Sequence, residues 1–213
     1  MSKVISLVGA ELGDFAYYLA VILSRKSTVM FIDNSFNGDV FNAVSDFDYE
    51  RRYIVKQNIV YGRALNYKRK EDSDYDFVII WHGLNISTTV LTESDSIYVL
   101  PDYTPYCISR IKNCMTGANL RDVTNLFMRN SVESNKISEK TVLALLEIDG
   151  KRLHDIIPFD AKDYENYLAF LYNGRQTFAH LSPSFYSCLI KCVMNEYEMD
   201  RKGATKLVNK AKS

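Results

Sequence analysis

The sequence predicts an α/β fold: a doubly wound, mostly parallel sheet flanked by helices. The chain opens with a buried strand, a glycine-flanked turn and a helix over residues 4–23. Further apolar strands then alternate with segments of helical period. One of them, Tyr75–Trp81, is almost continuously apolar, which is typical of a strand buried on both faces.

The first helix carries its apolar residues in the stripe of a helix that packs one face on a sheet. A second strand, 28–32, follows after a short return and ends at Asp33. Such a strand–helix–strand unit predicts a right-handed parallel crossover. The other expected strands are 54–61, 75–81, 96–100, 123–128 and 154–158, and the other expected helices are 105–115, 137–146, 161–172 and 182–199. Residues 68–74 are predicted to form a solvated loop.

Length and composition predict one globular domain. The chain has 213 residues, of which 47% are hydrophobic and 24% charged, and its formal net charge is zero. Residues 201–213 contain five Lys or Arg and no acid, which leaves 21 basic against 26 acidic residues in residues 1–200. We therefore expect a 1–200 domain with a mobile, basic 201–213 tail. A body with a net charge of −5 is a poor ligand for nucleic acid.

Cysteine and histidine usage indicates a reduced, cytoplasmic protein without a metal site. The four cysteines are Cys107, Cys114, Cys188 and Cys192, and the three histidines are His82, His154 and His180. They form no C-x-x-C pair and have no metal-ligand spacing. No run of about 18 apolar residues is present, so no membrane span is expected.

The opening turn has the form of a phosphate-binding loop but lacks the side chains that bind phosphate and magnesium. Such a loop, G-x-x-x-x-G-K-[ST], uses backbone N–H groups, a lysine and a hydroxyl to hold phosphate and magnesium. Here Gly9 and Gly13 are one residue too close together, and Asp14 and Phe15 stand where the lysine and the hydroxyl should be. Two unit charges about 4 Å apart interact by roughly 4 kcal/mol at an effective dielectric of about 20. An aspartate in place of the lysine should therefore abolish ordinary ATP affinity.

Several segments together resemble the MinD/ParA family of deviant Walker ATPases over roughly residues 3–199. The first is the opening strand, loop and helix, and the second is the strand that ends at Asp33. The others are Tyr75–Gly83, Leu126–Asn130, Ile157–Asp160 and Leu181–Pro183. The resemblance implies a P-loop NTPase fold, a nucleotide site at the loop, and a bacterial role in positioning division sites, plasmids, flagella or pili.

The departures from that family lie at its functional positions. The family's signature lysine falls near Ala10 or Glu11, its water-orienting aspartate is Ser35, and its magnesium-linked aspartate is Trp81. Phosphoryl transfer depends on positioning and charge neutralisation, so this site should not catalyse it. The expected vestigial nucleotide site comprises Gly9, Ala10, Glu11, Leu12, Gly13, Asp14, Phe15, Asp33, Trp81, Asn130 and Pro158.

Each retained residue also has a structural interpretation. The structural interpretation of Asp33 is a carboxylate that caps the end of its strand, and that of Asn130 is a residue of a turn. Trp81 and Phe15 are expected to pack together or to fill the vacated pocket. Cys188 and Cys192, four residues apart, are expected in the core.

The resulting hypothesis is a pseudo-ATPase that acts as a binding or positioning scaffold for a larger assembly, such as a pilus, secretion, conjugation or partition apparatus. No catalytic residue, metal or cofactor is expected. The alternative is a divergent ATPase that binds ATP and is completed by a partner. The face around the loop is expected to carry Glu11, Asp14, Phe15 and Trp81 and to suit a basic heterologous partner, because two copies meeting there would bring like charges together. A homodimer that needs no ATP would instead form through another surface, and the basic tail offers a contact with the inner face of the membrane.

Overall fold

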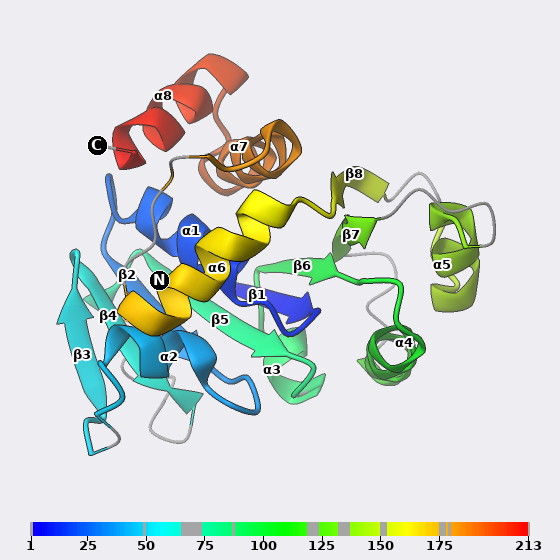
Figure 1. Ribbon diagram of the computed structural model, residues 1–213, viewed down its shortest axis with the longest axis horizontal. Helices are drawn as coiled ribbons and strands as arrows, with labels where there is room; N and C mark the ends of the chain where they lie inside the picture. The colour runs from blue at the N-terminus through cyan, green and yellow to red at the C-terminus, as the bar shows by residue number, and fades with distance from the viewer. Residues whose placement is uncertain are drawn as a thin grey trace.

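The computed structural model describes residues 2–48, 50–64, 74–86, 88–118, 124–131, 137–149, 153–174, 178 and 180–212. Its centre is an eight-stranded sheet in the order β3-β4-β2-β5-β1-β6-β7-β8 (Figure 1). The pairing of β3 with β4 is antiparallel, and the other six neighbouring pairs are parallel. The predicted fold class is confirmed.

The strands are β1 (Lys3–Gly9), β2 (Val29–Asp33), β3 (Tyr53–Lys56), β4 (Ile59–Arg63), β5 (Phe77–Gly83), β6 (Ser96–Leu100), β7 (Thr124–Ser131) and β8 (Leu153–Pro158). The helices are α1 (Asp14–Leu23), α2 (Asp39–Val44), α3 (Thr88–Thr92), α4 (Pro105–Ala118), α5 (Glu139–Leu146), α6 (Ala161–Asn173), α7 (Pro183–Tyr197) and α8 (Arg201–Ala211). The central strands β1, β2, β5 and β6 are buried almost throughout, as expected for strands covered on both faces.

Helices cover both faces of the sheet (Figure 1). On one face, the side chains of α1, α2, α6, α7 and α8 form a single apolar core with the strands. On the other face, α4 and α5 pack on β6 and β7, and α3 packs beside β2 and β5. The carboxyl ends of the parallel strands, where a doubly wound fold usually binds its ligand, are reached by the loop between β1 and α1.

The structure corrects the expectation of one strand at 54–61. This segment is the β3–β4 hairpin, whose two central residues, Gln57 and Asn58, have φ values of 54° and 62°. A two-residue turn with both φ values positive matches the right-handed twist of the paired strands. Helices α2 and α3 were not expected, and the predicted loop at 68–74 lies outside the described residues except for Asp74.

The expected mobile tail is wrong for residues 201–211, which form α8. Asp200 begins the helix by accepting a hydrogen bond from Gly203 N at 2.8 Å. The buried apolar residues of α8 belong to the same core as α1 and α7, and they are Ala204, Leu207, Val208 and Ala211. The thin apolar face that the sequence offers is therefore used for packing within the chain, and the lysines remain outside.

Candidate functional site

The loop between β1 and α1 is packed tightly at both of its glycines. A Cβ atom on Gly9, which has a φ of 150°, would lie 2.1 Å from the carbonyl oxygen of Leu100. A Cβ atom on Gly13 would lie 2.4 Å from Val40 Cγ2 and 3.1 Å from Trp81 Nε1. Ala10 N also donates to the Leu100 oxygen at 3.0 Å. The glycines are thus required by close packing against this chain's own residues.

Asp14 forms a buried ion pair with Arg129, which β7 supplies from 115 residues further along the chain. Arg129 Nη1 donates to Asp14 Oδ1 at 2.9 Å and Nη2 donates to Oδ2 at 2.8 Å. The two side chains are only 2% and 4% exposed. A bidentate pair of this kind is strong and geometrically specific. Arg129 is therefore neutralised by the residue that stands in the position of the phosphate-binding lysine.

Further groups hold Arg129 in place. Its guanidinium lies 5.0 Å from the centre of the Phe185 ring. Asp163 lies close enough to interact electrostatically with Arg129, although burial still raises the pKa of this carboxyl, against the lowering effect of its hydrogen bonds with Ser182. Among the described residues, Arg129 Nε and Asp163 Oδ2 have no hydrogen-bond partner. The arginine is thus part of the interior of the protein.

Phe15 and Trp81 are both part of the core. Phe15 is fully buried, and its ring centre lies 5.4 Å from that of Phe185 and 6.0 Å from that of Phe127. Trp81 is 2% exposed and lies against Gly13. The positions at which the resemblance places a magnesium-binding hydroxyl and a magnesium-linked carboxylate therefore carry apolar side chains in dry surroundings.

Asp33 acts as a cap at the end of β2. Its Oδ1 accepts from Ser35 N at 3.0 Å and from Ser35 Oγ at 2.6 Å, and its Oδ2 accepts from Phe41 N at 2.9 Å. Burial raises the pKa of Asp33, and these hydrogen bonds act to lower it. Phe41 lies in the first turn of α2, whose free N–H groups need such acceptors. This geometry fits the structural interpretation of Asp33.

Glu11 connects the loop to the end of β5 through a hydrogen bond. Its Oε1 accepts a hydrogen bond from Leu84 N at 2.8 Å. Burial raises the pKa of Glu11, while the Leu84 N–H lowers it. Both Glu11 and Leu12 are half-buried. The expectation that the face around the loop exposes Asp14, Phe15 and Trp81 is wrong, because all three are buried.

Asn130 and Pro158 lie on β7 and β8, which are separated from β1 by one and two strands respectively. Asn130 has a φ of 53° and sits where the register between β7 and β8 shifts. This is the turn-like role that asparagine tolerates well. Pro158 is exposed at the end of β8 and pairs with Ser131. In the sheet order, β6 and β7 separate β8 from β1.

The sequence did not predict the group of hydrogen-bonded side chains around the buried His82, which follows Trp81 in β5. Asn34 Nδ2 donates to His82 Nδ1 at 2.9 Å, so the proton of the neutral ring lies on Nε2, which faces Ser6 Oγ at 3.2 Å. Ser6 Oγ in turn lies 2.8 Å from Ser94 Oγ. Burial lowers the pKa of His82 to about 4. No signal in the sequence links these residues, because they come from four separate segments.

A cavity of about 290 Å³ opens at the carboxyl end of β2. Its lining consists of Asp33, Asn34, Ser35, Phe36, Arg63, Ala64 and Asn85. None of these residues belongs to the β1–α1 loop. In the part of the chain that the structure describes, no group of three His, Cys, Asp or Glu residues could hold a metal ion. Nor does any helix described there have the length and apolar character to cross a bilayer.

Arg129 is the functional-site residue that sequence reasoning missed most clearly. It lies within the segment Leu126–Asn130, but a single arginine in a predicted strand gives no sign of its partner. The signal available was its position among apolar neighbours, Phe127 and Met128, which predict a buried strand. A charge in such a strand needs a partner of opposite sign.

Comparison with known proteins gives a match in structure alone. No protein-family model and no curated protein matches the sequence. A ParA family ATPase from Chlorobium tepidum TLS is similar, with a TM-score of 0.58, 13% identity, and coverage of 99% of this chain and 97% of that one. A putative plasmid partition protein from Borrelia burgdorferi B31, solved with AMPPNP, also has a TM-score of 0.58, with 13% identity and 99% coverage of both chains.

The MinD cell division protein of Aquifex aeolicus is similar over 88% of this chain and 94% of its own, with 11% identity and a TM-score of 0.58. These identities are too low to transfer an activity or a residue's role. The structural agreement nevertheless covers 88–99% of this chain. The chain therefore has the fold of the ParA/MinD ATPases.

Proposed function

We propose that this chain is a catalytically degenerate protein of the MinD/ParA type, which acts as a binding or positioning scaffold and does not hydrolyse nucleotide. The observation that carries the proposal is the buried Asp14–Arg129 pair. A phosphate at the loop would have to displace Asp14 from Arg129 or bind beside both. Displacing one partner of a buried ion pair costs about 3–5 kcal/mol, and binding beside an uncompensated carboxylate is repulsive.

The other catalytic positions support the same conclusion. Catalysis of phosphoryl transfer needs cations and a positioned nucleophile. Phe15 and Trp81 supply neither, and both carboxylate oxygens of Asp33 accept hydrogen bonds from the chain itself. Glu11, near the signature position, accepts a hydrogen bond from the backbone N–H of Leu84. The carboxylates of Glu11, Asp14 and Asp33 are thus each engaged in an internal contact.

The partner in this proposal is another protein. Similar solved structures include a MinC:MinD cell division complex from Aquifex aeolicus, with a TM-score of 0.55 and 11% identity. For the present chain, a pilus, secretion, conjugation or partition apparatus in the bacterial cytoplasm is the proposed setting. The exposed lysines of α8, Lys202, Lys206 and Lys210, extend this proposal to a contact with the inner face of the membrane. A homodimer that forms without nucleotide is also consistent with the proposal, since two-fold pairing is common among soluble proteins.

The test is phosphate release by the purified protein with magnesium and ATP, together with its melting temperature and its mass in solution with and without ATP. We expect no turnover above background and no change in melting temperature or mass, because a ligand stabilises a protein only through affinity for the native state. The matched control is Asp33→Ala. Turnover that disappears in this variant would contradict the proposal, and turnover that appears only with a partner extract would favour the divergent ATPase.

A further inference from the structure

A larger cavity lies at the other end of the same sheet, between the last turns of α7 and strands β6, β7 and β8. Its volume is about 500 Å³. Its lining consists of Tyr98, Asn125, Phe127, His154, Lys191, Met194, Asn195, Glu198 and Met199. Asn125 and His154 stand near the amino ends of their strands, whereas the β1–α1 loop meets the carboxyl ends. The cavity is therefore separate from the vestigial nucleotide site.

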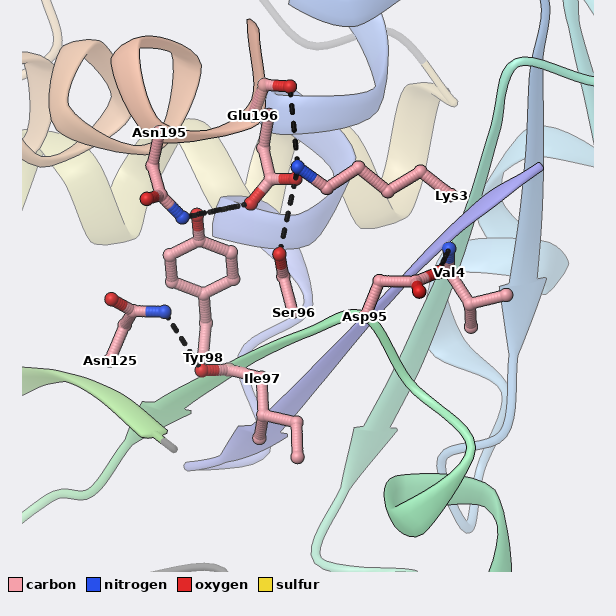
Figure 2. A network of polar contacts seen from close by, with 9 residues as sticks. All are labelled: Lys3, Val4, Asp95, Ser96, Ile97, Tyr98, Asn125, Asn195 and Glu196. Atoms are coloured by element: carbon pink, nitrogen blue, oxygen red, sulfur yellow. Dashed lines mark hydrogen bonds and ion pairs between the residues drawn. The ribbon is translucent and has the colours of Figure 1, made fainter. Parts of the chain in front are cut away.

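A buried hydrogen-bond network orients the two amide side chains of this cavity (Figure 2). Tyr98 Oη donates its one hydrogen to a hydrogen bond with the Glu196 carboxylate. The hydroxyl oxygen therefore accepts the hydrogen bond from Asn195 Nδ2, which lies 2.9 Å away. Asn125 Nδ2 donates to the carbonyl oxygen of Ile97 at 3.4 Å. Because a carbonyl oxygen only accepts, the amide nitrogen must be the atom that faces it.

The two amide oxygens are consequently left for a ligand. Figure 2 shows the side-chain oxygens of Asn125 and Asn195 on the same side of the Tyr98 ring. Among the described residues, neither oxygen has a hydrogen-bond partner. Both can only accept hydrogen bonds, so this wall of the cavity selects a ligand that carries N–H or O–H donors.

The charges around the cavity leave one carboxylate uncompensated. Lys191 Nζ lies 2.8 Å from Asp155 Oδ2 and donates to the His154 carbonyl oxygen at 2.7 Å. Glu196, behind Tyr98, is paired with Lys3 at 3.1 Å. Glu198 is exposed at the end of α7, and within the described part of the chain it has no ion-pair partner. The field in the cavity therefore favours a cation.

The remaining walls are apolar and aromatic. The rings of Tyr98 and Phe127 stack with centres 6.0 Å apart, and Met194 and Met199 face the same space. Tyr98 and Phe127 are each 1% exposed, so their rings form the floor of the cavity, whereas the half-buried methionines adapt to flat apolar ligands. We propose that this cavity binds a small organic cation with a flat apolar body, whose N–H groups donate to Asn125 and Asn195 and whose charge lies near Glu198. Its volume is within the range of small-molecule sites.

The probe for this proposal is benzamidinium, with benzoate as a control of equal size and opposite charge. Titration followed by backbone amide chemical shifts should show saturable changes for benzamidinium at β6, β7 and the end of α7, and none for benzoate. Glu198→Gln should weaken benzamidinium binding roughly three- to tenfold, as expected of one charge-assisted contact at a partly open site. The matched control, Glu165→Gln, changes an exposed acid on α6 and should leave the affinity unchanged.

A second variant, Met194→Trp, fills the cavity from the surface of α7 and should abolish binding while the melting temperature stays near that of the unmodified protein. Three results would overturn the proposal. They are benzoate binding as tightly as benzamidinium, benzamidinium binding that survives Met194→Trp, and absence of benzamidinium binding up to its solubility limit.

Discussion

The two ends of the central sheet each contain an ion pair, but the pairs have different access to water. At the loop end, the side chains of Asp14 and Arg129 are 2% and 4% exposed. At the opposite end, Glu196 is fully buried but the side chain of its partner Lys3 is 32% exposed. The β1–α1 loop is closed by the chain's own side chains, and the cavity of about 290 Å³ at that end of the sheet is lined by other segments. The opposite end keeps a larger cavity of about 500 Å³. The loop at which this fold usually binds its ligand is thus less accessible than the cavity at the opposite end.

This difference follows from where each charge can be solvated. The side chain of Arg129, on β7, lies over the Phe185 ring, and Asp14 supplies its counter-charge. Lys3, in contrast, reaches water, and Glu196 also accepts hydrogen bonds from Tyr98 and Ser96. Breaking a buried ion pair lowers the stability of the fold strongly, whereas a partly exposed pair contributes little to it. The comparison therefore makes quantitative predictions about substitutions at the two ends.

The largest effect is expected from Asp14→Ala. It leaves the Arg129 guanidinium buried without a counter-charge, and the free energy of unfolding should fall by about 3–5 kcal/mol. Replacing both partners with apolar residues, as in Asp14→Leu with Arg129→Met, should recover most of this loss. Urea unfolding measures both values. A loss below about 1 kcal/mol for Asp14→Ala, a value typical of solvated pairs, would mean that water reaches the loop end and that the site is not closed.

The next effect is a dependence of stability on pH at the loop end. The pKa of His82 is lowered by burial from 6.5 to about 4, so below pH 6.5 the unfolded chain takes up a proton that the native ring does not. The stability that the neutral ring contributes is therefore complete above about pH 6.5 and is lost as the pH falls toward 4. Linkage gives a loss of about 2 kcal/mol between pH 7 and pH 5.

The measurement compares urea unfolding at these two pH values for the unmodified protein and for His82→Gln. The variant lacks the titrating group, so its stability should change less over this range, whatever its stability at pH 7. Equal pH dependence in the two proteins would show that His82 is accessible to protons in the native state.

The core of the fold could be predicted from local pattern, and its exceptions have physical causes. Continuous apolar runs, such as Phe77–Trp81, predict buried strands because parallel strands are covered on both faces. The β3–β4 hairpin was missed because its turn is Gln57-Asn58, which lacks the glycine that usually marks such turns. Helix α8 was missed because two of its four buried residues are alanines, Ala204 and Ala211, which contribute little to an apolar pattern.

From the sequence, the candidate site could be predicted only by the phosphate-binding residues that it lacks. The sequence alone indicates that Asp14 and Phe15 stand where a phosphate loop needs other residues. It does not indicate that Arg129 neutralises Asp14, because the pair spans 115 residues and a pairing at that distance depends on the tertiary fold. The same holds for the cavity beside Asn125 and Asn195, whose polar groups have no spacing in common. Contacts between distant segments require the structure.

The smallest effect is expected from Lys3→Gln at the opposite end. The lysine side chain is partly exposed, and Glu196 keeps its hydrogen bonds from Tyr98, Ser96 and Asn195 Nδ2 when the ammonium is removed. We therefore expect the free energy of unfolding to fall by no more than about 1 kcal/mol. Lys191→Gln is the matched control, because Lys191 is similarly exposed in its pair with Asp155. Arg129→Gln, measured by the same urea titration, should cost several times more. If Lys3→Gln lowered the free energy of unfolding as much as Arg129→Gln, the two ion pairs would be equally inaccessible to water. The contrast that assigns ligand binding to the opposite end would then fail.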